Sequence, residues 1–290
     1  MKTKLKKLLY SSILLIGIGF LVYSPLCNMI QKSYNTSLIE NYENNIEQMS
    51  VEQKNELIKA VESYNENLKN NKVQTVDSDM LSISGFIGYI DIPKSDIYLP
   101  IYNSTSDYVL ENGIGHLEQT SLPYGGKSTH SVLTGHTGMA ENKLFTNIDK
   151  LVIGDIFYIH ILGEIHAYRV DKIKTVLPEE IKESDFKISN GKDYITLMTC
   201  TPYGINSHRL LIRGIRIPYS DEPADNSSVE SNNEKIVAQK PTTVSEHKEN
   251  AYKTYFCIIA IISVVLISLA LVISIIKIRK LKKEENHNAS

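Results

Sequence analysis

The sequence predicts a mainly β protein: a mostly antiparallel β-barrel with short helices, preceded by an N-terminal helical segment and bounded by two terminal transmembrane helices. Three observations support this fold class. β-Rich segments follow one another closely between residues 85 and 219, Pro, Gly or Asp/Asn clusters separate them, and an apolar run lies near each end of the chain. Closely spaced strands with only short helices between them favour a barrel over alternating βαβ units.

Composition limits the function classes that the chain can serve. The 290 residues are 42% hydrophobic and carry a formal net charge of −2, which suits one sizeable domain with membrane segments and gives no sign of nucleic-acid binding. The three cysteines are Cys27, Cys200 and Cys257. Because Cys200 is the only cysteine of the central domain, a disulfide within that domain is impossible.

Residues 1–30 are predicted to form a transmembrane or signal-anchor segment. A basic stretch, 1–7, precedes an uncharged apolar run that is long enough to cross a bilayer, for which about 20 residues suffice. A cleaved signal peptide has the same order of charge and apolarity, so both interpretations remain open. Lipidation of Cys27 is not expected, because Leu26 stands where a small residue would precede a lipidated cysteine.

Residues 255–276 are predicted to form the second transmembrane helix. They carry no charged residue and lead into a basic cytoplasmic tail, 277–290. Basic clusters lie outside both apolar segments, so the positive-inside rule places both termini in the cytoplasm and the central domain on the outer side of the cell membrane. Between domain and membrane, residues 220–254 are rich in Ser, Asn, Glu, Asp and Pro, which predicts a flexible polar linker.

Residues 31–84 are predicted to be a helical segment followed by a loop. Ser50 and Gln53 have the spacing of a capping box, which marks the start of a helix. Apolar residues then recur roughly at helical spacing: Val51, Leu57, Ile58, Val61 and Tyr64. We expect this stripe to pack against the chain's own domain; the alternative is a docking surface for a partner. Residues 71–84 are polar and lack a clear period, which indicates a loop.

Residues 85–219 form the predicted β-domain. Its expected strands are Gly85–Ile92, Ile97–Tyr102, Ser131–His136, Asp155–Leu162, Glu164–Val176, Tyr194–Thr199 and His208–Ile217. Short helices are expected at Thr105–Asn112 and Phe145–Leu151. The candidate functional residues lie at the ends of these strands.

Cys200 ends one predicted strand, and the chain turns at Pro202 and Gly204 before the next strand begins. A thiol at a strand end lies beside a loop that can shape a pocket, and the returning strand brings Arg209 to the same edge of the sheet. A thiol next to a guanidinium fits a nucleophile beside an oxyanion stabiliser. The alternative is a buried, inert cysteine that acts as a small hydrophobic residue.

A histidine would complete this chemistry. A thiol of pKa ~8.5 is mostly protonated at neutral pH, and acyl transfer requires an acid that protonates the leaving amine. The chain has eight histidines. His136 is preferred because it lies at a strand end, as Cys200 does, in a Gly-rich turn. His208 is the second choice because it precedes Arg209.

Several motifs together resemble the sortases, the cell-surface transpeptidases of Gram-positive bacteria. Cys200 in Thr-Leu-Met-Thr-Cys, His136 in Thr-Gly-His-Thr-Gly, and Arg209 look like their Cys/His/Arg set. The resemblance covers residues 85–219. Similarity to the pilus-assembling class C enzymes is carried by the second membrane span and by four stretches: Gly115–Gly126, Ser131–Gly138, Lys143–Leu151 and Cys200–Arg209.

The resemblance implies an eight-stranded sortase barrel and a role for each site residue. Cys200 would attack the Thr–Gly bond of a Leu-Pro-x-Thr-Gly-like sorting signal to give a thioacyl enzyme. His136 would protonate the leaving amine and later deprotonate the incoming one, and Arg209 would stabilise the oxyanion or position the substrate. Three further residues are expected to bind substrate: Leu133, Thr199 and Thr201. The resemblance implies no metal and no organic cofactor.

The chain departs from class C sortases at the N-terminal lid, which in that class commonly carries an Asp-Pro-aromatic motif. The corresponding stretch, Val76–Ile83, contains Asp77 and Asp79 but neither the proline nor the ring. A lid is therefore expected to be reduced or absent, with Asp77 as its candidate anchor.

The sequence thus predicts a cysteine transpeptidase whose partners are pilins or surface proteins with C-terminal sorting signals, and whose incoming amine is a pilin lysine. Three alternatives remain open. They are a sortase that anchors surface proteins to a peptidoglycan amine, a thiol peptidase in which water resolves the acyl enzyme, and a non-catalytic domain that binds envelope proteins.

Overall fold

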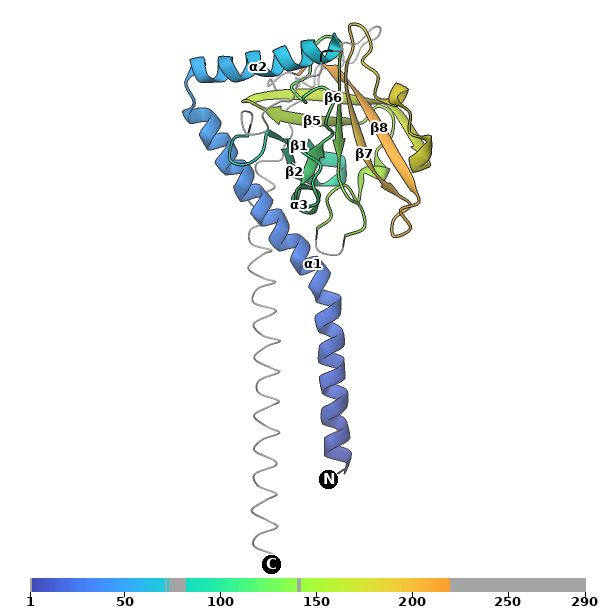
Figure 1. The fold of residues 1–290 in the computed structure, drawn as a ribbon. Helices are drawn as coiled ribbons and strands as arrows, with labels where there is room; N and C mark the ends of the chain where they lie inside the picture. The colour runs from blue at the N-terminus through green and yellow to red at the C-terminus, as the bar shows by residue number, and fades with distance from the viewer. Residues whose placement is uncertain (1, 71, 73–81, 140–141, 220–290) are drawn as a thin grey trace, which may run out of the picture. The chain divides into compact units, whose positions relative to one another are not determined.

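The structure is a computed structural model and describes residues 2–70, 72, 82–139 and 142–219 (Figure 1). Contacts divide the chain into two compact units, and residues 1–33 belong to one of them. The other comprises residues 34–244 and contains the barrel.

Eight strands close into one barrel in the order β1-β2-β3-β4-β7-β8-β6-β5 (Figure 1). The strands are β1 Gly88–Ile92, β2 Ile97–Tyr102, β3 Ile114–His116, β4 Thr129–Thr134, β5 Ile156–Ile161, β6 Glu164–Val176, β7 Asp193–Thr201 and β8 His208–Ile217. The pairs β2–β3 and β4–β7 are parallel, and the other neighbouring pairs are antiparallel. The predicted mainly β, mostly antiparallel eight-stranded barrel is confirmed.

The strand limits differ from the expected ones at several places; β7, for example, runs from Asp193 to Thr201 and so contains Cys200. The sequence did not reveal β3, because this strand has three residues and takes its conformation from its neighbours β2 and β4. β1 begins three residues later than expected, since Ile83 and Phe86 pair with each other just before it. β4 ends at Thr134, so His136 follows the strand instead of lying within it.

Short helical elements interrupt the strands, as expected. The helix α3, Asp107–Asn112, lies within the stretch predicted to be helical. In the second such stretch only a 3₁₀ turn forms, η2, Ile148–Lys150. The remaining 3₁₀ turns are η1 Pro93–Ser95, η3 Pro178–Glu180 and η4 Glu183–Asp185.

Two helices precede the barrel, α1 Lys2–Gln48 and α2 Val51–Lys69. The predicted capping box starts α2: the Gln53 amide donates to Ser50 Oγ at 3.2 Å, and the Ser50 amide donates to Gln53 Oε1 at 2.9 Å. Two residues of the predicted apolar stripe, Val61 and Tyr64, are buried, and the Tyr64 hydroxyl donates to the Thr120 carbonyl. The stripe therefore packs on the chain's own domain, although its first member, Val51, is exposed.

Several predictions concern segments that the structure does not describe. The linker 220–254, the span 255–276, the tail 277–290 and the lid residue Asp77 lie outside the described residues. Among the described residues, no helix has the length and apolarity of a membrane span. The N-terminal span stays a prediction.

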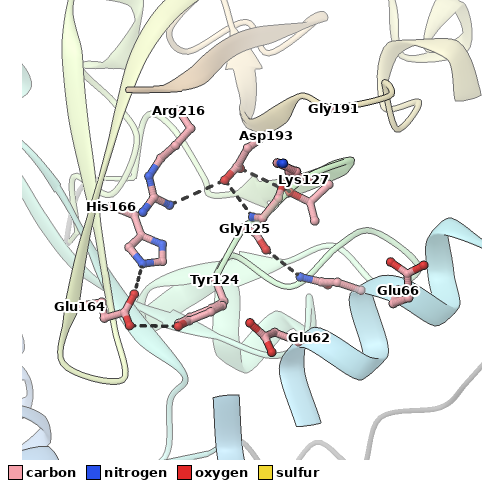
Figure 2. Close-up of a pocket in the computed structure, with 13 residues that line it drawn as sticks. Glu62, Glu66, Tyr124, Gly125, Lys127, Glu164, His166, Gly191, Asp193 and Arg216 are labelled. Atoms are coloured by element: carbon pink, nitrogen blue, oxygen red, sulfur yellow. Dashed lines mark hydrogen bonds and ion pairs between the residues drawn. The ribbon is translucent and has the colours of Figure 1, made fainter. Parts of the chain in front are cut away.

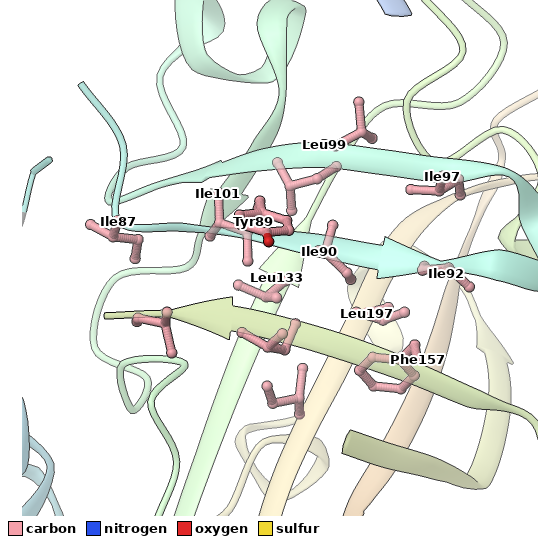
Figure 3. Packing of buried hydrophobic residues seen from close by; sticks show 14 of the residues in the cluster. Ile87, Tyr89, Ile90, Ile92, Ile97, Leu99, Ile101, Leu133, Phe157 and Leu197 are labelled. Carbon is pink, nitrogen blue, oxygen red and sulfur yellow. The ribbon is translucent and has the colours of Figure 1, made fainter. Parts of the chain in front are cut away.

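The barrel interior is filled by apolar side chains from facing strands, which hold the strand ends in fixed positions (Figure 3). Fully buried members include Ile90, Ile92, Ile101, Leu133, Phe157 and Leu197. All five residues of β1 are buried, because one face of this strand points into the barrel and the other is covered by α1. Tyr42 of α1 packs edge-on against Tyr89 of β1, with ring centroids 6.2 Å apart.

We expect Tyr42→Phe to lower the free energy of unfolding by about 1–3 kcal/mol. Burial raises the pKa of Tyr42 to about 12, so the hydroxyl keeps its proton, which it donates to the Ile87 carbonyl at 3.0 Å. The same oxygen accepts from the Leu162 amide at 3.0 Å, and the substitution leaves both buried backbone groups unpaired. Urea unfolding of the full chain measures this loss. The matched Tyr34→Phe variant changes an exposed tyrosine of the same helix, and an equal loss there would contradict the prediction.

Candidate active site

Cys200 lies directly opposite Arg209 in the antiparallel pair β7–β8. The next pair toward the connecting loop is Thr201 with His208. Opposed residues in an antiparallel pair have Cβ atoms about 4.5–5.5 Å apart. Both Cys200 and Arg209 are half-buried, so the alternative of a fully buried thiol does not describe this cysteine. The sequence prediction that the returning strand brings an arginine beside the cysteine is confirmed in position.

The segment that carries His136 is bonded to β7 one residue before Cys200. β4 and β7 run parallel, and Thr134 is in register with Met198. Beyond the strand, the Gly135 amide donates to the Met198 carbonyl at 3.2 Å, and the Thr199 hydroxyl donates to the Gly135 carbonyl at 2.7 Å. His136 therefore leaves β4 at the level of Cys200, and its side chain is half-buried.

The loops that follow His136 and Cys200 approach each other closely. Gly138 has φ +78°, and a Cβ placed on it would lie 3.6 Å from the Gly204 nitrogen and 3.7 Å from the Tyr203 ring. Internal bonds hold the first loop, because the His136 carbonyl accepts from the Phe145 amide at 3.0 Å. The residue types that the sequence singled out thus meet at one end of the barrel.

The Arg209 guanidinium is held along the β7–β8 loop. Its Nη1 donates to the carbonyls of Asn206, at 3.4 Å, and His208, at 3.3 Å. Asn206 has φ +59°, a left-handed conformation that asparagine tolerates better than most residues. Among the described residues these are the hydrogen bonds that the guanidinium makes, and both use Nη1.

Burial separates the histidines of the described chain into two groups. His116, His130 and His166 are buried, and desolvation lowers the pKa of each. His136, His160 and His208 are half-buried; His160 stacks on the Tyr89 ring of β1, with centroids 4.2 Å apart, and His208 Nδ1 lies 2.8 Å from Ser207 Oγ. The preference for His136 and the alternative of His208 therefore both stand.

We expect the free energy of unfolding to fall as the pH drops from about 6.5 to about 4. Burial lowers the pKa of His116 to about 4, below its value in the unfolded chain, and its Nε2 lies 3.0 Å from the Ser121 carbonyl. In this pH range the folded state thus binds fewer protons than the unfolded chain. The stabilisation that neutral His116 contributes is complete above the pKa of the unfolded chain, and it is lost as the pH falls toward the pKa of the folded state. Denaturant unfolding across this pH range measures the slope. A His116→Gln variant with an unchanged slope would contradict the assignment to His116.

The three residues predicted to bind substrate lie in different environments. Leu133 is fully buried in the barrel core, and Thr199 is 3% exposed, with its hydroxyl bonded to Gly135. Thr201 is half-buried beside Cys200. Their role in substrate binding stays a prediction.

The structure adds two apolar side chains that sequence reasoning did not select. Tyr203 is 64% exposed and Ile205 is 72% exposed, and both lie in the loop that follows Cys200. The sequence signal that could have identified them is the presence of two large apolar residues in a turn whose other residues are polar or glycine. Within the described residues, no group of three or more His, Cys, Asp or Glu side chains is arranged to hold a metal ion.

Comparison with known proteins identifies the family. The sortase domain model matches residues 90–217. Sortase A of Bacillus anthracis is 30% identical over 128 residues, which are 44% of this chain and 58% of that protein. Sortase A of Staphylococcus aureus (strain NCTC 8325 / PS 47) is 30% identical over 152 residues, 49% of this chain and 71% of that protein. The first two curated relatives are matched over 58% and 47% of their length.

Solved structures of sortases C are similar over the whole length of their own chains. Sortase C1 of Streptococcus agalactiae is 41% identical, with a TM-score of 0.59, and the match covers 63% of this chain and all of that one. Sortase C of Clostridium perfringens, solved with the C-terminal cell wall sorting motif, is 51% identical, with a TM-score of 0.58 and 62% and 98% coverage. With a cysteine, an arginine and a histidine-bearing loop at one end of such a barrel, the chain belongs to the sortase family, whose members are cysteine transpeptidases.

Proposed function

We propose that this chain is a membrane-anchored, pilin-polymerising transpeptidase that uses Cys200. It cleaves a Leu-Pro-x-Thr-Gly-like sorting signal between Thr and Gly and transfers the acyl group to a pilin lysine. The observation that carries this proposal is the pairing of Cys200 with Arg209 across β7 and β8, beside the loop of His136. Likeness to the C. perfringens sortase C, solved with a sorting motif, supports the substrate class.

The first step forms a thioester and breaks the peptide bond. The Cys200 sulfur, as a thiolate, attacks the threonine carbonyl carbon, and Arg209 donates to the oxyanion that develops. The C–N bond to glycine then breaks, and His136 gives its proton to the leaving amine. The held position of the guanidinium, at the carbonyls of Asn206 and His208, suits this task because the donors need little reorganisation.

The second step returns the enzyme to its starting state. The lysine Nε attacks the thioester carbonyl carbon, His136 takes a proton from this amine, and the C–S bond breaks to release Cys200. The product is an isopeptide bond between two pilins. No electron is gained or lost overall, so the cycle closes with these three side chains.

The exposed loop after Cys200 offers a contact for the apolar part of the signal. Tyr203 and Ile205 present large apolar side chains to solvent in the loop that follows Cys200. Covering such surface is favourable by about 25 cal/mol per Å². Leucine and proline at the start of the sorting signal have the chemistry that would cover it.

Mass spectrometry of the full chain with a Leu-Pro-x-Thr-Gly peptide and a purified pilin tests the proposal. We expect a thioacyl adduct on Cys200 that moves to the pilin lysine. Transfer only to a peptidoglycan-type amine would favour the anchoring alternative, and release only by water would favour a peptidase. A folded protein with an accessible thiol that forms no adduct with a panel of sorting peptides would contradict the proposal.

The identity of the catalytic histidine is tested in the same assay. His136→Ala is expected to lower transfer by roughly 10²–10⁴-fold, the usual worth of general acid–base catalysis. His208→Ala is the matched control, because His208 is also half-buried and lies beside Arg209. The larger loss in His208→Ala would reverse the assignment.

We further propose that both termini lie in the cytoplasm and that the barrel lies outside the cell membrane. The basic stretches 1–7 and 277–290, outside the two apolar segments, support this orientation. Protease added to intact protoplasts should then release the barrel. Protection of the barrel until the membrane is broken would contradict the orientation.

A further inference from the structure

Thr199 immediately precedes Cys200 in β7, and its side chain lies on the other face of the strand. Successive side chains of a strand point to opposite faces. Ile195 and Leu197 belong to the barrel core, in which Figure 3 labels Leu197. Thr199 comes two residues after Leu197, so it shares this inner face, and it is 3% exposed. The Thr199 hydroxyl is therefore not on the face of β7 that carries the Cys200 sulfur.

The Thr199 hydroxyl joins β7 to the segment that carries His136. It donates a hydrogen bond to the Gly135 carbonyl at 2.7 Å. This carbonyl belongs to the peptide group that contains the His136 nitrogen, and a peptide group is planar. Holding the carbonyl oxygen therefore holds the plane from which the Cα atom and the side chain of His136 depart.

Close packing and further hydrogen bonds hold the same stretch of backbone. A Cβ placed on Gly135 would lie 2.6 Å from Ile114 Cδ1 and 3.1 Å from Phe145 Cδ2, so only glycine fits there. The Gly135 amide donates to the Met198 carbonyl at 3.2 Å, and the His136 carbonyl accepts from the Phe145 amide at 3.0 Å. The backbone at His136 is thus fixed by β3, by β7 and by the returning end of its own loop.

The strand that carries Thr199 is also anchored at its other end. Asp193, the first residue of β7, lines a polar cavity of about 530 Å³ (Figure 2). Its carboxylate accepts from the Gly126 amide at 2.8 Å and from the Tyr168 hydroxyl at 3.0 Å, and it lies 3.7 Å from Arg216 Nη1. Because β7 is held at both ends, the Thr199 hydroxyl acts from a fixed position.

We propose that Thr199 is a positioning residue, which orients His136 for proton transfer beside Cys200 through its hydrogen bond to Gly135. This inference rests on the proposed function, in which His136 protonates the leaving amine. It gives Thr199 a task other than substrate binding, because the hydroxyl proton is committed to Gly135 and the side chain lies in the core. A misplacement of a reacting group by about 1 Å can cost about a hundredfold in rate, so such a contact matters for catalysis.

Thr199→Val keeps the shape of the side chain and removes the hydroxyl. In single-turnover mixing of the full chain with a Leu-Pro-x-Thr-Gly peptide, we expect it to lower the maximal rate of thioester formation about 10–100-fold. The half-saturating peptide concentration should stay unchanged, and Thr199→Ser, which keeps the hydroxyl, should restore the rate. A raised half-saturating concentration with an unchanged maximal rate would show that Thr199 binds substrate, and would overturn the proposal.

Thr196→Val is the matched control for the loss of a buried hydroxyl. Thr196 lies three residues earlier on β7 and is 2% exposed, and its hydroxyl oxygen lies 2.8 Å from His130 Nε2 instead of meeting the His136 segment. This variant should keep the rate of thioester formation. An equal loss of rate in Thr196→Val and Thr199→Val would reduce the effect to a general loosening of β7 and would overturn the proposal.

A double-mutant cycle identifies the residue through which Thr199 acts. In the His136→Ala background, Thr199→Val should cost less than about twofold, because the group that it positions is gone. A loss of the full size in that background would show that Thr199 acts on the thiol or on the substrate, which contradicts the proposal.

The position of His136 can also be measured without any reaction, by NMR of the full chain with isotope-labelled histidine. The imidazole resonance of His136, identified by its absence in His136→Gln, should shift in Thr199→Val and stay in place in Thr199→Ser and Thr196→Val. An unshifted resonance in Thr199→Val would overturn the proposal. Because this measurement needs no sorting peptide, it separates a failure of this inference from a failure of the proposed function.

Discussion

Replacing Cys200 with alanine is expected to abolish the thioacyl enzyme and to lower transpeptidation at least about a thousandfold. The sulfur is the atom that would become bonded to the substrate, and no other cysteine lies in residues 31–250. The fold should survive, because the side chain is half-buried and packs at a strand end rather than in the barrel core. Mass spectrometry of the enzyme after incubation with the sorting peptide gives the result directly.

Two further variants make this result specific. Cys27→Ala removes the other free cysteine of the described chain and should leave the adduct in place. Cys200→Ser keeps the shape of the side chain but replaces the thiol by a much weaker nucleophile, so it should resemble alanine. An adduct that persists in Cys200→Ala, or an equal loss in Cys27→Ala, would remove Cys200 from the mechanism.

Local sequence signals were sufficient for one half of the proposed site. Cys200 and Arg209 belong to two strands joined by a short turn, and Pro202 and Gly204 mark that turn. Once the turn is placed, antiparallel pairing brings the two side chains together. The alternation of apolar and polar residues, together with the turn residues between the runs, also predicted most strands of the barrel, because each strand keeps one face in the core.

The other half of the site depends on pairing between distant segments. His136 is brought to the level of Cys200 by the parallel pair β4–β7, whose strands are separated by more than fifty residues that include β5 and β6. Periodicity indicates that a strand exists but does not identify its parallel neighbour. The resemblance to sortases supplied that link. The same limitation hid β3, which pairs with its neighbours through two residues on each side.

The polar cavity at the start of β7 could not be predicted from the sequence at all. Asp193, His166 and Arg216 lie at the ends of three different strands, and Glu62 lies on a helix more than a hundred residues earlier. Each of these residues by itself resembles an ordinary polar surface residue. Only the closed barrel, with α2 bonded across one end through Asn65 and Leu122, brings them together.

Arg209→Ala is expected to lower kcat/KM by roughly 10²–10³-fold, the usual worth of one oxyanion donor. The kinetic constants separate the two roles open to this arginine. An oxyanion stabiliser acts in the transition state, so its loss lowers kcat and leaves KM unchanged, whereas loss of a substrate-positioning contact raises KM. Arg209→Lys keeps the positive charge but loses the planar, paired donors of the guanidinium. If the reaction needs two hydrogen bonds from this side chain to the substrate, the lysine variant should be scarcely more active than Arg209→Ala.

The matched control for Arg209 is Arg213→Ala, an arginine four residues further along β8. Arg213 forms two bonds to the Asp171 carboxylate, at 2.9 and 2.7 Å, and its guanidinium lies 4.1 Å from the centroid of the Tyr194 ring. Its contacts are therefore internal to the barrel wall, and the variant should lose some stability while keeping its kcat. Equal losses of activity in the two variants would mean that β8 needs its arginines for folding. A loss confined to Arg209→Ala would assign that guanidinium to the reaction, because only the residue opposite Cys200 can reach the group that the thiol attacks.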